Sequence, residues 1–214
     1  MKLYCINKVY LFVVIAFLIS HITHPQDSDN KWVIGIGVNG VDIRDQNNVE
    51  EMFKDYLSIN FNDVNMSDAF FRVSVSNYLK NGFSVQISTS LNKIKKGYNY
   101  KPQDQLQNLS FFAVDAKVKY DLNSIIDETG RFDPYILLGL GYSRIDVLSG
   151  FNLGAGYGFN VWLTNALGLN FQSDYNHFLQ ANPYDYFQHS FGLVFKLNGV
   201  RKFKWSGNNK NCYN

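Results

Sequence analysis

Apolar residues alternate with small or polar residues along residues 151–163, FNLGAGYGFNVWL. A period of two predicts a β-strand, because successive side chains leave opposite faces of the pleat. Seven other segments repeat this pattern over about 11 to 13 residues each, longer than the usual five or six of a globular strand. The eight predicted strands are 31–42, 68–79, 83–94, 109–120, 134–146, 151–163, 167–178 and 186–197.

The connections between these segments predict an antiparallel, up-and-down order. Residues 80–82 (KNG) and 164–166 (TNA) have the composition of tight hairpin turns. Longer connections follow the first and third strands. Short turns at one end and long loops at the other are typical of transmembrane barrels. The connection after the fourth strand, LNSIIDETGRFD, is longer than this rule expects, and 147–150 is shorter.

One face of the predicted sheet carries bulky apolar side chains, and the other carries Gly, Ser, Asn and charged residues. Alternation alone also fits a soluble eight-stranded barrel with an apolar cavity. The interior of an eight-stranded barrel is just wide enough to be filled by side chains, and a wall so rich in glycine leaves room for long polar ones. We therefore expect the polar face inside and the apolar face against lipid, since a soluble protein would not expose such a belt. The predicted fold class is an all-β, eight-stranded antiparallel up-and-down transmembrane β-barrel.

Composition agrees with this prediction and adds an export signal. Charged residues make up 18% and aromatic residues 16% of the chain, which favours β structure over disorder. Lys2 and Lys8 precede a short apolar run, an order typical of a secretory signal, and the run is too short for a spanning helix. We expect a signal peptide at 1–25, a barrel at 26–199 and a polar tail at 200–214. Without those first residues the basic and acidic residues balance, so nucleic acid is not an expected partner.

Several segments resemble the OmpA-like outer-membrane β-barrel family. These are PYILLGLGYSRID, FNLGAGYGFNVWLTNALGLNFQSDYNHF and YFQHSFGLVFKLNG, which resemble its last four strands, and SDAFFRVSVSNYLKNGFSVQISTSLNKI, which resembles its second hairpin. The resemblance covers about residues 31–199. It implies the outer membrane of a Gram-negative bacterium, recognition of the last strand by the barrel-assembly machinery, and a mainly structural role. We expect the barrel domain alone, without the peptidoglycan-binding domain of many members.

Five inward-facing polar residues are expected near the middle of the barrel. They are Arg72, Asp115, Lys117, Gln172 and Asp174. Ionised groups in so narrow a lumen need partners, so we predict an ion-pair network that plugs the lumen. A narrow pore whose ion pairs rearrange is the alternative.

Two other groups of residues are candidates for contacts outside the lumen. Tyr175, His177 and His189 are predicted at the lipid-headgroup rim, with the two histidines as possible cross-strand neighbours. A lipid-modifying enzyme that uses His177 and Ser173 is a weaker alternative, because no carboxylate is evident on that face. In the first long loop, an i, i+3, i+4 spacing predicts a short amphipathic helix that caps the mouth or contacts a partner. Its apolar face is Val49, Met52, Phe53, Tyr56 and Leu57.

The sequence predicts a non-enzymatic barrel that contributes to envelope structure or surface interaction through its outer loops. The alternatives are a low-conductance porin and, less favoured, an enzyme at the rim. Outer-membrane lipid and an extracellular ligand of the first loop are the expected partners. No cofactor and no metal site are expected.

Overall fold

The computed structural model describes residues 30–45, 50, 54, 64–66, 71–94, 109–126, 131–179 and 184–197. They form nine strands and one helical turn, α3 (Asn123–Ile126). The strands are β1 (Trp32–Asp45), β2 (Asn65–Met66), β3 (Arg72–Lys80), β4 (Phe83–Ile94), β5 (Leu109–Asp121), β6 (Phe132–Ile145), β7 (Leu148–Trp162), β8 (Leu167–Phe178) and β9 (Tyr184–Leu197). The predicted signal peptide and tail lie outside the described residues.

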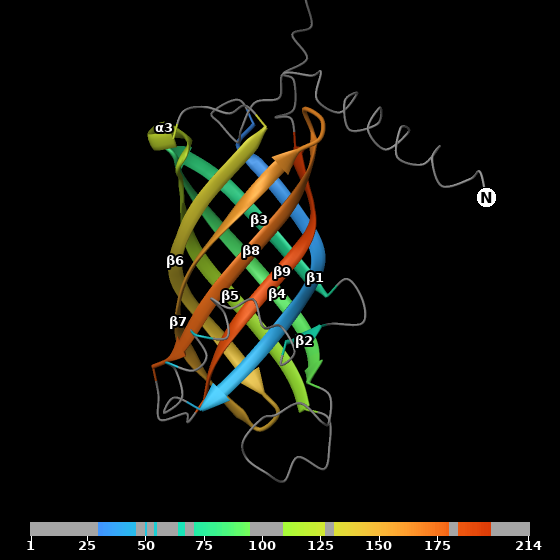
Figure 1. Cartoon of the computed structure of the whole chain (residues 1–214), viewed down its shortest axis with the longest axis vertical. Coiled ribbons are helices and arrows are strands. Elements are labelled where there is room, and N and C mark those ends of the chain that lie inside the picture. Colours follow the sequence, from blue (N-terminus) through green and yellow to red (C-terminus); the bar gives the residue numbers. More distant parts are fainter. Residues whose placement is uncertain are drawn as a thin grey trace, which may run out of the picture.

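The strands close into a barrel. From β3 to β9, each strand pairs antiparallel with the next one in sequence, and β1 pairs with both β3 and β9 (Figure 1). The pairing of β3 with β1 ends at Gly37. The two-residue β2 pairs with the same edge of β1 shortly beyond, at Gly40 and Val41, so β2 occupies the same place in the wall as β3. Eight strand positions therefore make up the wall, as the alternation predicted. No helix among the described residues has the length and hydropathy needed to cross a membrane.

The two ends of the barrel differ in their connections. One end, here the turn end, carries α3 and the hairpin at Asn81 and Gly82, whose φ values of 51° and 79° are those that Asn and Gly tolerate in tight turns. The other, here the loop end, receives the C-termini of β1, β4, β6 and β8 (Figure 1). β6 and β7 meet there in a two-residue turn at 146–147, so β7 begins three residues earlier than predicted.

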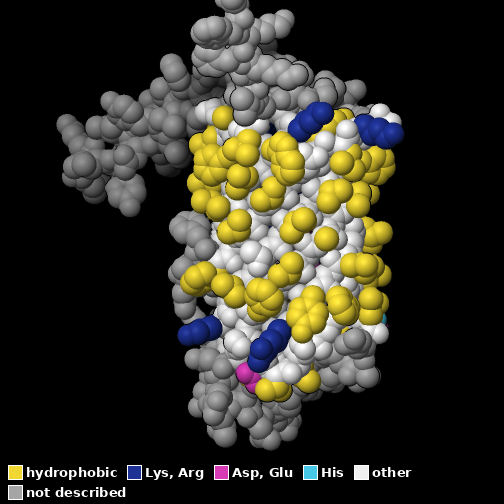
Figure 2. All heavy atoms as spheres, turned by 180° about the vertical axis from the view of Figure 1, so that it is seen from behind, with side chains coloured by type: hydrophobic (Ala, Val, Ile, Leu, Met, Phe, Trp, Pro, Cys, Tyr) yellow, Lys and Arg dark blue, Asp and Glu magenta, His cyan; other side chains and the backbone are white. Residues whose placement is uncertain are grey.

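The outward face is apolar, as the glycine pattern predicted. Figure 2 shows apolar side chains spread over the barrel wall, with Lys and Arg side chains toward its two ends. Outward residues that stay exposed include Ile36, Val73, Ile87, Phe112, Val114, Val118, Ile136, Leu138, Leu140, Phe151, Leu153, Phe191 and Phe195. The glycines of β7 lie on the opposite face, so the strand that first showed the alternation points Gly154, Gly156 and Gly158 into the lumen.

The lumen is not polar throughout. At the loop end, inward side chains form an apolar cluster, which we call the loop-end cluster: Val41, Ile43, Ile94, Phe111, Ala113, Ile145, Phe178 and Tyr186. At the turn end Val33, Trp162 and Val194 form a second, turn-end cluster. The sequence predicted a small and polar inward face, and these residues are the exceptions. They lie near the strand ends, where the inward-facing positions hold apolar residues instead of polar ones.

Candidate functional site

Lys117 stands at the centre of the lumen, and two glycines make room for it. In the register of the wall, Lys117 on β5 is followed by Gly139 on β6, Gly154 on β7 and then Asn176 on β8. A Cβ on Gly154 would lie 2.8 Å from Lys117 Cε and 3.0 Å from Nζ. The lysine therefore extends along the inner wall over both glycines, and Nζ donates to Asn176 Oδ1 at 3.3 Å.

Two carboxylates neutralise this lysine. Lys117 Nζ lies 3.0 Å from Asp174 Oδ2 and 3.7 Å from Asp115 Oδ1, and all three side chains are at most 1% exposed. Gln172 Nε2 donates to both oxygens of Asp174, at 3.2 and 2.9 Å, and Ser88 Oγ lies 3.5 Å from Asp115 Oδ2. Four of the five residues predicted for the lumen network thus form one connected group.

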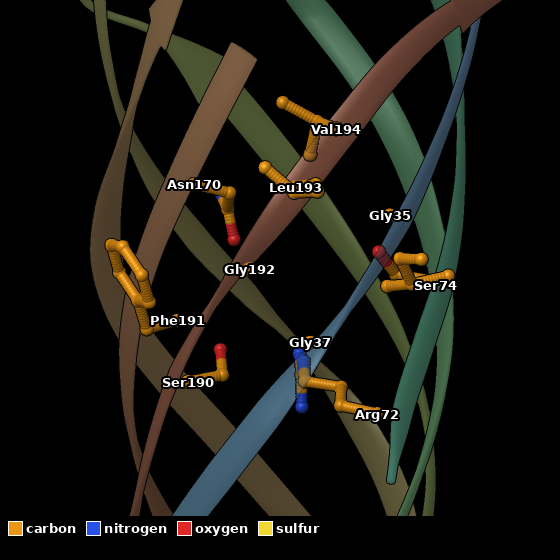
Figure 3. Close-up of a pocket in the computed structure, with 11 residues that line it drawn as sticks. Gly35, Gly37, Arg72, Ser74, Asn170, Ser190, Phe191, Gly192, Leu193 and Val194 are labelled. Carbon is orange, nitrogen blue, oxygen red and sulfur yellow. The ribbon is translucent and has the colours of Figure 1, made fainter. Parts of the chain in front are cut away.

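Arg72, the fifth predicted member, lies one step away from this group. Its Nη1 donates to Ser90 Oγ at 3.1 Å, and within the described part of the chain its Nη2 has no hydrogen-bond partner. The guanidinium lies beside Gly37, its register partner on β1, in a cavity of about 10 Å³ (Figure 3). Arg72 therefore adds a positive charge to the lumen, and among the described residues it forms no direct ion pair.

Further polar residues extend the network toward the turn end. Tyr135 Oη donates to Gln172 Oε1 at 3.2 Å, and Lys119 Nζ lies 3.7 Å from the centre of the Tyr135 ring. Lys196 Nζ lies 3.6 Å from the centre of the Trp162 ring, a cation–π contact. The inward parity of Lys119 and Lys196 was visible in the sequence, but their aromatic partners depend on strand register.

The charged side chains that the structure describes inside the barrel balance. Among the described residues, four buried basic side chains face inward: Arg72, Lys117, Lys119 and Lys196. Three buried carboxylates face them, with Asp121 half-buried at the turn end as a fourth: Asp115, Asp121, Asp133 and Asp174. These eight described side chains therefore carry no formal excess of either sign.

The predicted rim residues lie on the outer wall near the loop end, but the two histidines are not neighbours. His189 on β9 pairs with Ser173 on β8, and Ser173 Oγ lies 3.0 Å from His189 Nδ1. His177 instead lies beside Asp185, with Nδ1 2.8 Å from Oδ2. Tyr175, between Ser173 and His177 on β8, donates to the same carboxylate oxygen of Asp185.

Asp185 contradicts the prediction that no carboxylate lies on this face. A carboxylate does lie on the face of the histidines, and its oxygens accept hydrogen bonds from Tyr175, His177 and the Phe178 amide. It was missed because Asp185 precedes the predicted last strand, whereas β9 begins at Tyr184. His189 also differs from the prediction, since it is buried in the wall, while the His177 side chain is 49% exposed.

The five apolar residues of the predicted loop helix, Val49 to Leu57, lie outside the described residues. Two described residues between them, Glu50 and Lys54, have helical backbone, and their side chains form an i, i+4 ion pair at 2.9 Å. Among the described residues there is no group of three or more His, Cys, Asp or Glu side chains suited to a metal ion.

Comparison with solved structures identifies the fold. Neisserial surface protein A, from Neisseria, superposes with a TM-score of 0.51 and 14% identity over 77% of this chain and 96% of that one. This chain has the fold of the OmpA-like outer-membrane barrels. Two weaker matches are Ail of Yersinia pestis (TM-score 0.47, 12% identity, 77% of this chain and 97% of that one) and OprG from Pseudomonas aeruginosa (0.48, 12%, 78% and 96%).

No protein-family model matches the sequence, and no curated protein sequence matches it. The OmpA-like fold, which the glycine and aromatic patterns suggested, is thus confirmed by structure alone. At 14% identity the similarity extends to the barrel and not to particular side chains.

Proposed function

We propose that this chain is a non-enzymatic outer-membrane barrel whose lumen does not conduct, and that it contributes to envelope structure or surface interaction through its loop end. The observation that carries the proposal is the filling of the lumen. Three layers of side chains lie in series along it: the loop-end cluster, the polar network around Lys117, and the turn-end cluster with its cation–π contact.

The apolar layers are the strongest argument against a water-filled pore. Every member of the loop-end cluster is at most 5% exposed, and Phe111 and Tyr186 meet edge to face with ring centroids 5.3 Å apart. An ion that crossed this layer would exchange most of its hydration shell for apolar side chains, because the Tyr186 hydroxyl is already bonded to Ser143. The lumenal cavities described near Arg72 and Lys119 have volumes of about 10 and 20 Å³, enough for isolated water molecules only.

Placement in a membrane is supported by the outward apolar belt. Each of the eight long strands pairs with a neighbour on both sides, and these pairs satisfy backbone hydrogen bonds that hydrocarbon would leave unmade. A soluble barrel of this kind would leave an exposed apolar surface over most of its wall. Such a surface is stable in contact with the hydrocarbon chains of a membrane.

Two measurements on the purified protein test these points separately. An unheated SDS gel should show a faster band that shifts on heating, as closed membrane barrels do, and detergent-free solubility would refute the membrane placement. Planar-bilayer recordings of the same sample should show no discrete steps. Regular steps that change when Asp115 and Lys117 are substituted together would favour the porin alternative, in which the ion pairs rearrange.

The enzymatic alternative has one observation in its favour, the Ser173–His189 contact on the outer wall. The groups of a catalytic triad are nevertheless split between two sites. Ser173 contacts His189, whereas Asp185 contacts His177, four residues nearer the loop end on each strand. Ser173 is also only 2% exposed. We expect no lipid hydrolysis or acyl transfer by the barrel in lipid vesicles, and turnover that His177→Ala or Ser173→Ala abolishes would overturn this part of the proposal.

A further inference from the structure

Two carboxyl groups meet at the turn end of the barrel, where α3 joins the wall (Figure 1). Asp121 is the last residue of β5, and its backbone amide donates to Gly82 O in the β3–β4 hairpin at 2.9 Å, so it lies level with the turn and outside the membrane-spanning part of the strand. Asp133, the second residue of β6, is 5% exposed. Both line the cavity of about 20 Å³, and their carboxyl groups share a hydrogen bond. An ionised carboxylate has no donor, so this bond requires a proton on one of them.

Asn123, the first residue of α3, connects the same two groups. Its backbone amide donates to Asp121 Oδ1 at 2.8 Å, and its Nδ2 donates to Asp133 Oδ1 at 3.0 Å. Asn123 is 4% exposed, and among the described residues its own Oδ1 has no hydrogen-bond partner. This junction therefore has more acceptor oxygens than donors, and a proton is the smallest addition that supplies a donor.

Asp133 is the better stabilised anion of the pair. Besides the Asn123 amide, it accepts from Asn160 Nδ2 and from Trp162 Nε1, each at 3.3 Å. N–H donors favour the charged form of a carboxylate. Asp121 receives one such bond among the described residues and lies half-buried beside this charge. Burial, followed by the charge of Asp133, raises the pKa of Asp121 from 3.8 to about 6.

Three other titratable groups line the cavity, Tyr78 of β3, Lys119 of β5 and Tyr135 of β6. Lys119 is the cation among these three, and a nearby cation favours ionised carboxylates. Its Nζ lies 3.7 Å from the centre of the Tyr135 ring. Among the described residues it forms no ion pair with Asp121 or Asp133, so it offsets the repulsion between the two carboxylates only in part.

We propose that Asp121 and Asp133 share one proton, and that loss of this proton releases α3 from the wall. Two ionised carboxylates in contact repel each other, and Asp121, the more exposed of the two, then turns toward water and gives up its bond to the Asn123 amide. The pKa of Asp121 is higher in the folded protein than in an unfolded chain. The stability that the shared proton contributes is therefore fully present below pH 3.8 and is lost as the pH rises through about 6. The turn end is fastened in acid and loosened near neutral pH, whether or not the lumen conducts.

The test is NMR spectroscopy of the isotope-labelled full chain in detergent micelles, with EDTA present so that no metal ion replaces the proton. The carbon-13 shifts of the side-chain carboxyl groups should show one aspartate with a midpoint at about pH 6. The amides of Ile125 and Ile126, which donate to Leu122 O within α3, report the state of this turn through hydrogen exchange. Their exchange, corrected for the intrinsic rate, should rise about tenfold across the same midpoint. The raised pKa of Asp121 allows about a hundredfold at most, and the smaller value reflects its half-buried position.

Three variants complete the test. In Asp121→Asn the side-chain amide donates to Asp133 with no proton to lose, so exchange in α3 should no longer depend on pH. Asp146→Asn, in the turn at the loop end, is the matched control and should behave as wild type, because Asn tolerates its φ of 54°. In Asp133→Asn, which tests the pair independently if Asp121→Asn does not fold, the Asp121 midpoint should fall to about pH 4. The proposal is overturned by a wild type with no carboxyl midpoint above about pH 5, by pH-dependent exchange that persists in Asp121→Asn, or by an Asp121 midpoint that stays at about pH 6 in Asp133→Asn.

Discussion

Replacing Lys117 with methionine removes the cation from the centre of the lumen while keeping a side chain of similar length over the two glycines. Asp174 Oδ2 at 3.0 Å and Asp115 Oδ1 at 3.7 Å then lose the charge that neutralises them. Removing one partner from a buried ion pair costs about 3–5 kcal/mol, because the other charge stays buried without compensation. A stranded carboxylate can instead take up a proton, which costs about 4 kcal/mol at pH 7 for an ordinary aspartic acid.

Both routes lead to the same expectation for Lys117→Met, a loss of about 3–5 kcal/mol in the free energy of unfolding. The assay is guanidinium unfolding of the barrel in lipid vesicles, followed by tryptophan fluorescence and by unheated gel mobility. Lys80→Met, at an exposed position, is the matched control and should change stability by less than about 0.5 kcal/mol.

A double variant separates charge from packing. Adding Asp174→Asn to Lys117→Met removes one of the stranded carboxylates and should recover at least about 1 kcal/mol, a coupling of the size that residues in contact show. A loss below about 1 kcal/mol for Lys117→Met alone would refute the reasoning. It would mean that water screens these charges as it does on a surface, and it would revive the porin alternative.

Three further outcomes follow from the packing of the barrel. A Cβ on Gly139 would lie 2.2 Å from a backbone carbonyl oxygen of β5, whereas on Gly154 its nearest atoms belong to side chains that can shift; chemical unfolding should therefore show Gly139→Ala as the costlier of the two, with Gly154→Ala at about 1–3 kcal/mol. Phe111→Ala should cost about 3–5 kcal/mol in the same assay if the loop-end cluster is dry, and much less if water fills the space. Gly82 has φ of 79° after Asn81 at 51°, so Gly82→Val should lower stability by about 1–2 kcal/mol, and an unchanged unfolding midpoint would contradict the assigned turn.

The strands themselves could be predicted from the sequence because a period of two is a local property. The segments 83–94 and 167–178 were assigned with the bounds that β4 and β8 have. The inward placement of Gly154, Gly156 and Gly158 also followed from residue size, since a narrow lumen that holds long polar chains needs small neighbours. Errors occurred at strand ends, where alternation fades. β9 begins two residues before the prediction, and that difference hid Asp185.

The candidate sites depended on information that alternation does not contain. The sequence determined which side chains face inward, because parity along a strand sets the face. It did not determine that Lys117 reaches Asp174 over Gly139 and Gly154, or that His189 faces Ser173 and not His177. Sliding one strand by two residues keeps every side chain on its face and changes every neighbour. The closed barrel removes that freedom, because the stagger of all eight strand positions must be mutually consistent when β1 meets β9.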